Sequence, residues 1–236
     1  MDNSLLTVYK SPFPKLRLGS PNDGGYVIAD IPNIQYGTLL SGGIYIDITF
    51  EHDFVTKYGC SCLAYDGTID SITITDPNVT FIKKNIGYSN DDSTTNLHDE
   101  INANQSIFIK MNIEGGEYQW IESLTSDHFN KFEQIVIEFH HPFSKSKIIS
   151  TINETHYLIH FHGNNCCGFM NNRGINVPNV FQCTYLHKKY ITSPELNTDV
   201  IPGPLDKNNV EGDDIFINYP PFVNIIPTST SDSSTN

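Results

Sequence analysis

Stretches that favour β-strands alternate with stretches that favour helices along most of this chain, and this alternation restricts the fold more than any other feature. The expected strands are short, are rich in β-branched or aromatic residues, and are bounded by Gly, Asp or Asn. Strands that alternate with helices usually pair in parallel and carry helices on the sheet faces. We therefore expect strands at residues 26–29, 38–44, 61–65, 79–86, 106–112 and 133–140, and helices at 49–58, 116–124 and 145–152.

The pattern changes after Thr155, where two expected strands, 157–161 and 180–187, have no helix between them. Such a pair indicates an antiparallel hairpin at one edge of the sheet. The sequence therefore predicts an α/β fold with a mostly parallel sheet and an antiparallel edge hairpin. One domain is expected over residues 1–226, and the small, polar residues 227–236 are expected to be disordered.

Acidic residues outnumber basic ones, 27 to 14, which gives a net charge of −13. Nucleic-acid affinity depends on clustered Lys and Arg, so this balance excludes a generally basic nucleic-acid binder and leaves only a local basic groove open. The first residues lack the charged and apolar regions of a signal peptide, and runs of about 18 apolar residues do not occur. We therefore expect a cytoplasmic protein without a nucleic-acid or membrane partner.

The chain has an odd number of cysteines, and none of them form a C-x-x-C pair. This usage argues against a zinc site and against a disulfide framework. We expect five buried free thiols in a reducing compartment, at Cys60, Cys62, Cys166, Cys167 and Cys183.

Three segments follow expected strands, at the edge where the carboxyl ends of parallel strands bind ligands. Paired glycines, Gly42 and Gly43, allow a ligand to approach the backbone closely, and a plain turn explains them equally well. Asp66 ends the next strand and can bind the two hydroxyls of a ribose, or it is a turn residue. Glu114 and Glu117 form a polar pocket wall, or they complement the N-terminal charge of the following helix.

These segments belong to an ordered set of six motifs. The motifs are RLGSPNDGGYV (17–27), DITFE (47–51), KMNIEGGE (110–117), IEFHH (137–141), HFHGNN (160–165) and PNVFQCTY (178–185). Together they resemble the FkbM-like methyltransferases, in particular a branch with DGGY, KxDIEGxE, EFH and HxHGNN motifs. The resemblance covers roughly residues 17–209, including LDKNN at 205–209; none of the motifs is specific alone.

The resemblance implies a Rossmann-like methyltransferase fold, formed by a single methyltransferase-like domain, that uses S-adenosylmethionine. It implies methyl transfer to a hydroxyl of a sugar or another small molecule. By position in the motifs, Asp66 takes the ribose hydroxyls and Asn112 lies beside the cofactor. The implied cofactor-binding residues are Gly42, Gly43, Asp47, Asp66, Asn112 and Glu114.

Three residues depart from the family pattern. Tyr45 stands where a second glycine is usual, Gly67 where a proline is usual, and Asn112 where an aspartate is usual. These departures motivate an alternative, a catalytically degenerate methyltransferase-fold protein that binds a glycan or a protein, or that serves as a structural component.

Four histidines form two pairs near strand ends: His140 with His141, and His160 with His162. The i, i+2 spacing places His160 and His162 on one face of a strand. A histidine titrates near neutrality and can deprotonate a hydroxyl, so we predict catalytic roles for His140, His162 and Glu138. A metal site built from the histidines and Glu138 and a purely structural role are the alternatives; the predicted site includes no metal.

Overall fold

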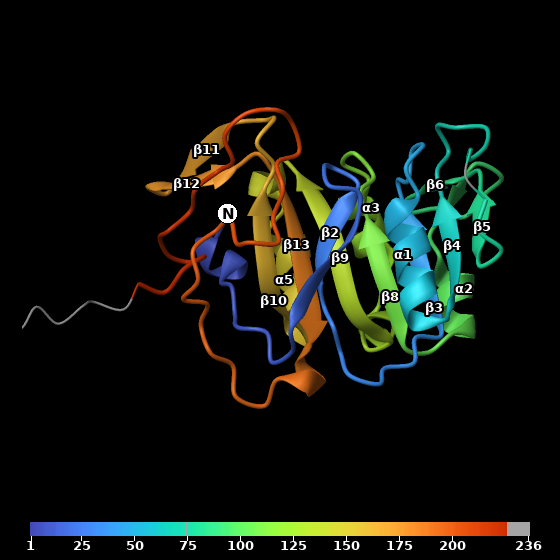
Figure 1. The fold of residues 1–236 in the computed structure, drawn as a ribbon, viewed down its shortest axis with the longest axis horizontal. Helices are drawn as coiled ribbons and strands as arrows, with labels where there is room; N and C mark the ends of the chain where they lie inside the picture. Colours follow the sequence, from blue (N-terminus) through green and yellow to red (C-terminus); the bar gives the residue numbers. More distant parts are fainter. Residues whose placement is uncertain (74, 226–236) are drawn as a thin grey trace, which may run out of the picture.

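Seven strands form the main sheet of the computed structural model, which describes residues 1–73 and 75–225 (Figure 1). The expected disordered tail, 227–236, lies outside the described residues. The strand order is β10-β13-β9-β8-β3-β4-β5. The strands are β3 (Thr38–Gly42), β4 (Ser61–Tyr65), β5 (Val79–Ile82), β8 (Ile107–Met111), β9 (Phe132–His140), β10 (His156–Gly163) and β13 (Val180–His187).

Strands β3, β4, β5, β8 and β9 pair in parallel, whereas β13 runs antiparallel to both β9 and β10. This arrangement confirms the predicted α/β fold with a mostly parallel sheet and an antiparallel edge pair. The expected strand 79–86 is wrong in its second half, because Lys84 N donates to Ile82 O in a tight turn. After this turn β6 (Asn85–Ile86) pairs with β7 (Thr94–Thr95) in a separate two-stranded sheet.

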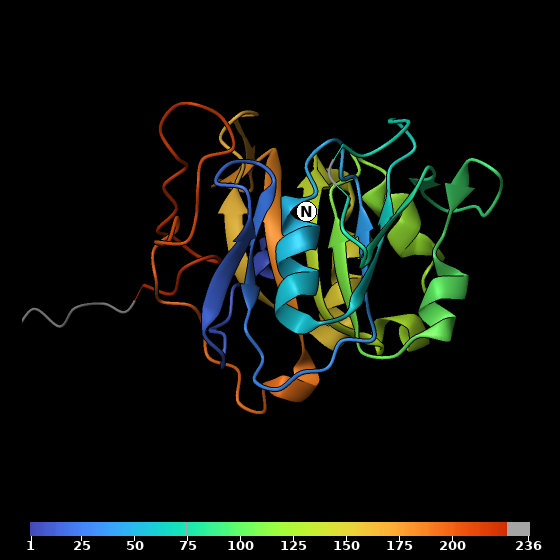
Figure 2. The same cartoon turned by 45° about the vertical axis from the view of Figure 1, so that its right-hand side comes forward.

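Different elements cover the two faces of the main sheet (Figures 1 and 2). On one face lie α1 (Thr49–Tyr58) and a hairpin of β1 (Lys15–Gly19) and β2 (Gly25–Ala29). The expected strand 26–29 is therefore present, but it pairs with β1 instead of leading into the main sheet. The other face carries α2 (His98–Ala103), α3 (Glu117–Ser123), α4 (Ser126–Phe129) and α5 (Ser146–Thr155).

Shorter elements complete the fold at the β10 end of the sheet and at the chain's N-terminus. A hairpin of β11 and β12 follows β10, and three short 3-10 helices lie in the connections. These elements are β11 (Phe169–Asn172), β12 (Ile175–Pro178), η1 (Asn3–Leu6), η2 (Pro142–Ser144) and η3 (Lys188–Tyr190).

Aromatic side chains fill the core between α1 and the sheet. Phe108 of β8 is fully buried, and its ring centroid lies 4.5 Å from that of Phe54 and 5.6 Å from that of Tyr36. The Phe50 ring is 6.1 Å away. Rings at these separations bury large apolar areas and fix the distance between the helix and the strands that end at the carboxyl edge.

We expect Phe108→Ala to lower the free energy of unfolding by about 3–5 kcal/mol, since it removes a buried ring and leaves a cavity. Phe216, whose side chain is 66% exposed, is the control, and Phe216→Ala should change stability by no more than about 0.5 kcal/mol. Urea denaturation of both variants measures the difference. Equal losses would contradict this account of the core.

The cysteine prediction is confirmed for three residues and wrong for two. Cys60, Cys62 and Cys183 are free and buried, as expected. Cys166 and Cys167, in the turn after β10, are joined by a disulfide between adjacent residues. Both residues are exposed, so they lack the apolar burial that was expected for free thiols.

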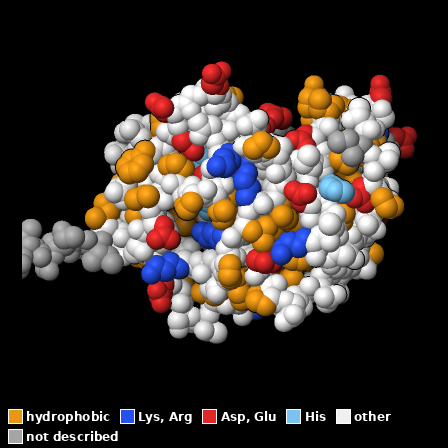
Figure 3. Space-filling model, in the orientation of Figure 1, with side chains coloured by type: hydrophobic (Ala, Val, Ile, Leu, Met, Phe, Trp, Pro, Cys, Tyr) orange, Lys and Arg blue, Asp and Glu red, His pale blue; other side chains and the backbone are white. Residues whose placement is uncertain are grey.

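Surface properties agree with the composition. In residues 1–73 and 75–225 no helix is both long and apolar enough to cross a membrane. On the face drawn in Figure 3, Lys and Arg side chains occur in small groups separated by neutral and acidic ones. That face therefore carries no broad basic surface.

Candidate functional site

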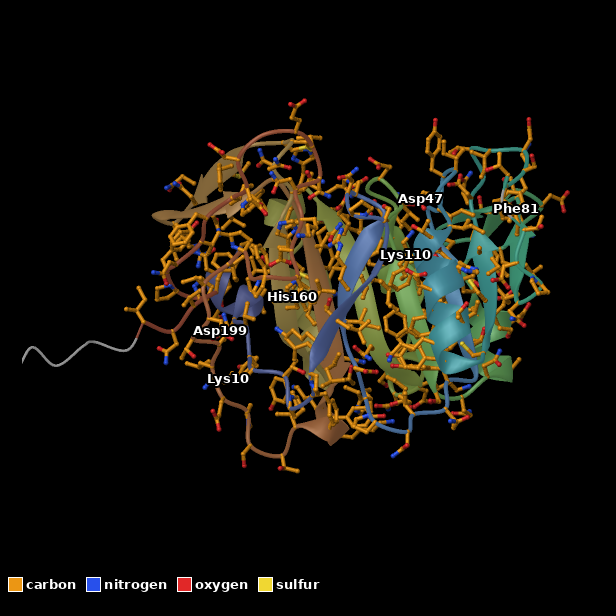
Figure 4. All side chains as sticks on the ribbon, in the orientation of Figure 1. Lys10, Asp47, Phe81, Lys110, His160 and Asp199 are labelled. Atoms are coloured by element: carbon orange, nitrogen blue, oxygen red, sulfur yellow. A yellow bond between two sulfur atoms is a disulfide. The ribbon has the colours of Figure 1, made fainter. Side chains whose placement is uncertain are left out.

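A cavity of about 740 Å³ lies at the carboxyl ends of β3, β4 and β8. The chain leaves β3 for β4 and β5 on one side and returns to β8 and β9 on the other, so strand order reverses between β3 and β8. Ligands of open α/β sheets bind at such a reversal. Asp47 and Lys110, both in the wall, lie beside α1 near these strand ends (Figure 4).

Most of the predicted cofactor-binding residues come together here. Five of the six line the cavity, and the sixth, Gly42, lies beneath it, where its carbonyl accepts a hydrogen bond from Asn112 N at 3.0 Å. The five are Gly43, Asp47, Asp66, Asn112 and Glu114.

Gly43 is a position where only glycine fits. Its φ of +71° lies in the left-handed region, and this conformation ends β3 two residues before the expected Ile44. A Cβ at this position would lie 1.6 Å from Asn112 O. The paired glycines therefore allow the β3 loop to pass directly over β8.

Gly43→Ala should destabilise the protein by more than about 3 kcal/mol, because left-handed strain adds to an overlap with backbone. Gly59 is the matched control: its φ is +68°, but a Cβ there would meet nothing within 4 Å. Gly59→Ala should cost only about 1–2 kcal/mol. Chemical denaturation compares the two, and equal costs would show that close approach to Asn112 is not the constraint.

Asp66 is buried and fixes the β3 and β4 loops. Its Oδ2 accepts from Tyr45 N at 2.8 Å, and its Oδ1 accepts from Thr68 N at 2.8 Å and Thr68 Oγ1 at 2.6 Å. A carboxylate has about four acceptor positions, so one is left for a ligand. The Tyr45 side chain is 64% exposed and does not fill the cavity.

Two acceptor atoms in the cavity wall are buried without a hydrogen-bond partner among the described residues: Asn112 Oδ1 and Glu51 Oε2. Asn112 Nδ2 donates to the Tyr26 hydroxyl at 3.3 Å, and Glu51 Oε1 accepts from Ser41 Oγ at 2.5 Å. An unpaired buried acceptor costs about 1–3 kcal/mol. Glu51 is fully buried, whereas Asn112 is only half-buried, so a bound molecule with an N–H or O–H group would remove that cost at Asn112.

Lys110 is a site residue for which the sequence pattern predicted no role. Its Nζ donates to Gly43 O at 2.8 Å and lies 3.7 Å from Glu51 Oε1, although the side chain is only 3% exposed. The signal was present, since a lysine inside the apolar strand IFIKM must find partners when buried. Lys110 therefore joins the glycine loop, which contains Gly42 and Gly43, to β8.

The charge of the cavity wall is acidic. Five carboxylates and two lysines line it. Such an excess of negative charge favours a ligand with a positive group. The carboxylates are Asp23, Asp47, Glu51, Asp66 and Glu114, and the lysines are Lys84 and Lys110.

His140, at the end of β9, lies among three carboxylates. Its Nδ1 is 3.2 Å from Glu117 Oε1, and its Nε2 is 3.4 Å from Glu114 Oε2 and 3.5 Å from Glu138 Oε1. Burial opposes the charged imidazole, but the hydrogen bond and charge of Glu117, with the charges of Glu138 and Glu114, raise the pKa of His140. Burial, followed by the charge of Asp23, raises the pKa of Glu138 to about 7.

Of the two acids that the sequence placed here, Glu114 lines the cavity, whereas Glu117 is fully buried and accepts hydrogen bonds at the start of α3. Its Oε2 accepts from Gly115 N at 2.8 Å in the turn that begins α3. Its Oε1 accepts from the backbone N of His140 at 2.9 Å. A fully buried carboxylate thus joins the α3 turn to the end of β9.

The remaining histidines do not join this group. His162 lies on β10, beyond β13, and its Nε2 is 3.0 Å from Asp214 Oδ2 in a buried pair. His160 pairs with Asp206, and His141 is exposed. No three His, Cys, Asp or Glu residues are arranged to hold a metal ion in the described part of the chain. The structure therefore brings together His140 and Glu138 but separates His162 from them.

His140 should titrate above its ordinary pKa of about 6.5 in an NMR pH titration. A raised folded-state pKa stabilises the protein fully below the unfolded pKa, and this contribution is lost as pH rises through the folded pKa. Glu117→Gln should lower the pKa of His140, because it removes a negative charge that stabilises the protonated imidazole against the effect of burial. Glu122→Gln, on the exposed side of the same helix, is the control and should leave it unchanged. Titration of His140 below 6.5 in the parent protein would contradict the geometry.

Comparison with known proteins does not add to this geometry. A scan against protein-family models and a search of curated proteins both found no match. The features of the cavity are a glycine loop over β8, a carboxylate at the end of β4, unpaired acceptors and an acidic wall, with His140 next to Glu114 of that wall.

Proposed function

We propose that this protein is an S-adenosylmethionine-dependent O-methyltransferase that acts on a hydroxyl of a sugar or another small molecule. The observation that carries the proposal is the cavity at the β3/β8 reversal, where the glycine loop, Asp66 and the unpaired Asn112 Oδ1 share one wall. The strand order and the edge pair of β10 and β13 support the Rossmann-like methyltransferase fold that the motifs imply.

The residues present fit this cofactor. Asp66 would take a ribose hydroxyl with its remaining acceptor position, and Asn112 Oδ1 would accept from an N–H group. The acidic wall suits a sulfonium cation, and the volume lies within the usual range of about 300–1,000 Å³ for small-molecule sites. When bound, S-adenosylmethionine supplies an electrophilic methyl carbon on positively charged sulfur.

The chain's own contribution to the reaction is alignment and proton removal. Glu117 Oε1 accepts the Nδ1 proton of His140, which leaves Nε2 as the basic atom of the neutral imidazole. Glu114, in the cavity wall, lies 3.4 Å from that nitrogen, so His140 stands at the border of the cavity. In this proposal Nε2 takes the proton of the acceptor hydroxyl, and Glu138 stabilises the charged imidazole.

S-adenosylhomocysteine at about 100 times its dissociation constant should stabilise the fold by about 2.7 kcal/mol, which corresponds to a rise in melting temperature of about 5–10 °C. Asp66→Asn should abolish most of this rise, since it removes the ribose acceptor and weakens the loop. Asp70→Asn is the control, because Asp70 lies in the same loop with its side chain 92% exposed. Differential scanning calorimetry measures all three proteins.

The alternative, a catalytically degenerate protein, predicts that S-adenosylhomocysteine does not bind. The methyltransferase proposal fails if the parent protein binds no S-adenosylhomocysteine at about 1 mM. This concentration is far above the dissociation constant of a specific cofactor site. A folded protein with that behaviour would be a catalytically degenerate member that binds a glycan or a protein. Asn112, which lacks the negative charge of the aspartate usual at that position, would then account for the loss of cofactor binding.

A further inference from the structure

A second cavity, of about 600 Å³, lies on the other side of the β1–β2 hairpin. Its walls are β1, β2, β10 and the segment 197–206, which crosses over them. The two cavities share no lining residue. In Figure 4, His160 and Asp199 lie to the left of the hairpin, and Asp47 and Lys110 lie to its right.

Lys15, on β1, offers a hydrogen-bond donor to this cavity. Its Nζ has no hydrogen-bond or ion-pair partner within residues 1–73 and 75–225. Burial lowers the pKa of Lys15, and the nearby charges of Asp206 and Asp199 oppose this effect. Lys15 is half-buried, and its ammonium group takes its acceptors from water or from a ligand.

His160, on β10, offers an acceptor. Its Nε2 lies 2.8 Å from Asp206 Oδ1, and Asp206 Oδ2 accepts from Gly203 N at 2.7 Å. Burial lowers the pKa of His160. Burial would raise the pKa of Asp206, but the positive charge of protonated His160 and its hydrogen bond to Asp206 lower that pKa to about 2. Because the Asp206 carboxylate accepts at Nε2, the neutral imidazole carries its proton on Nε2. Nδ1, which has no partner in the described part of the chain, is left with a free lone pair.

The balance of charge decides which ligand suits these groups. One ammonium, on Lys15, stands against two carboxylates, Asp199 and Asp206, so the cavity has no excess positive charge to attract an anion. A hydroxyl group both donates and accepts, so it can satisfy an N–H donor and a ring nitrogen in the same site. Apolar side chains form much of the remaining wall: Val8, Val27, Val200 and Leu205.

We propose that this second cavity binds a small neutral polyhydroxylated molecule, a polyol or a monosaccharide. Lys15 donates to one hydroxyl, and His160 Nδ1 and the Asp199 carboxylate accept from others. The C–H face of the ligand lies against the valines and Leu205. The volume accommodates one sugar ring together with ordered water.

The test uses the full chain without added cofactor, so its result is independent of the proposed methyl transfer. D-glucose, L-rhamnose and myo-inositol are titrated by NMR, with butyrate and benzoate as anionic probes. At least one neutral probe should bind saturably with a dissociation constant on the order of 1 mM, and the anions should bind at least tenfold more weakly, on the order of 10 mM. S-adenosylhomocysteine should not displace the neutral probe.

Lys15→Met keeps most of the apolar stem and removes the ammonium, and it should weaken binding by about tenfold or more. Lys10→Met is the matched control: Lys10 lies outside the cavity, is exposed, and pairs with Glu195 at 3.3 Å. It should leave the affinity unchanged. Asp199→Asn, a change at an exposed position, provides a second test should Lys15→Met fail to fold, and it should weaken binding about threefold or more.

Three results would overturn the proposal. The first is no saturable binding of any neutral probe at about 100 mM, well above the range of a specific site. The second is tighter binding of butyrate or benzoate than of the neutral probes. The third is an affinity for the neutral probe that neither Lys15→Met nor Asp199→Asn reduces, or that S-adenosylhomocysteine abolishes, since the probe would then occupy another place.

Discussion

The buried ammonium of Lys110 joins the elements that form the floor of the first cavity. It extends from the middle of the sheet and donates to the carbonyl of Gly43, while Glu51 of α1 balances its charge. Loss of Lys110 or of Glu51 would leave the other charge uncompensated in the core, which is strongly unfavourable. The same loop lies directly over β8, where Asn112 N donates to Gly42 O and Asn112 O leaves no room for a Cβ at Gly43.

The two faces of the sheet differ in chemistry because side chains alternate along each strand. The face under α3 and α5 is filled by apolar side chains such as Ile137, Phe139 and Phe161. The face under α1 and the β1–β2 hairpin carries polar side chains in neighbouring rows across the strands. One row holds Ser41, Lys110, Thr184 and His160, with Val136 between Lys110 and Thr184, and the next holds Glu138, Gln182 and His162.

This polar face explains why both cavities open on the same side of the sheet. The β1–β2 hairpin covers the middle of the polar rows, where Gln134 Nε2 donates to Ala29 O and Thr184 Oγ1 donates to Val27 O. On either side of the hairpin, polar groups are left that the protein does not pair. Asn112 Oδ1 and Glu51 Oε2 lie on one side, and Lys15 Nζ lies on the other.

The sequence by itself determined the seven strands of the main sheet to within a few residues, their parallel pairing, the antiparallel edge pair and the gathering of Gly43, Asp66 and Asn112 at one edge. These follow from local patterns, since period and turn residues fix where strands end and parallel strands present their carboxyl ends together. Only the tertiary structure decided the partners of the histidines, the role of Lys110, the β1–β2 hairpin over the sheet and the bond between Cys166 and Cys167. His140 meets Glu117 from 23 residues away, whereas His162 meets Asp214 from 52 residues away. Such contacts depend on how distant segments pack, and no local periodicity records them.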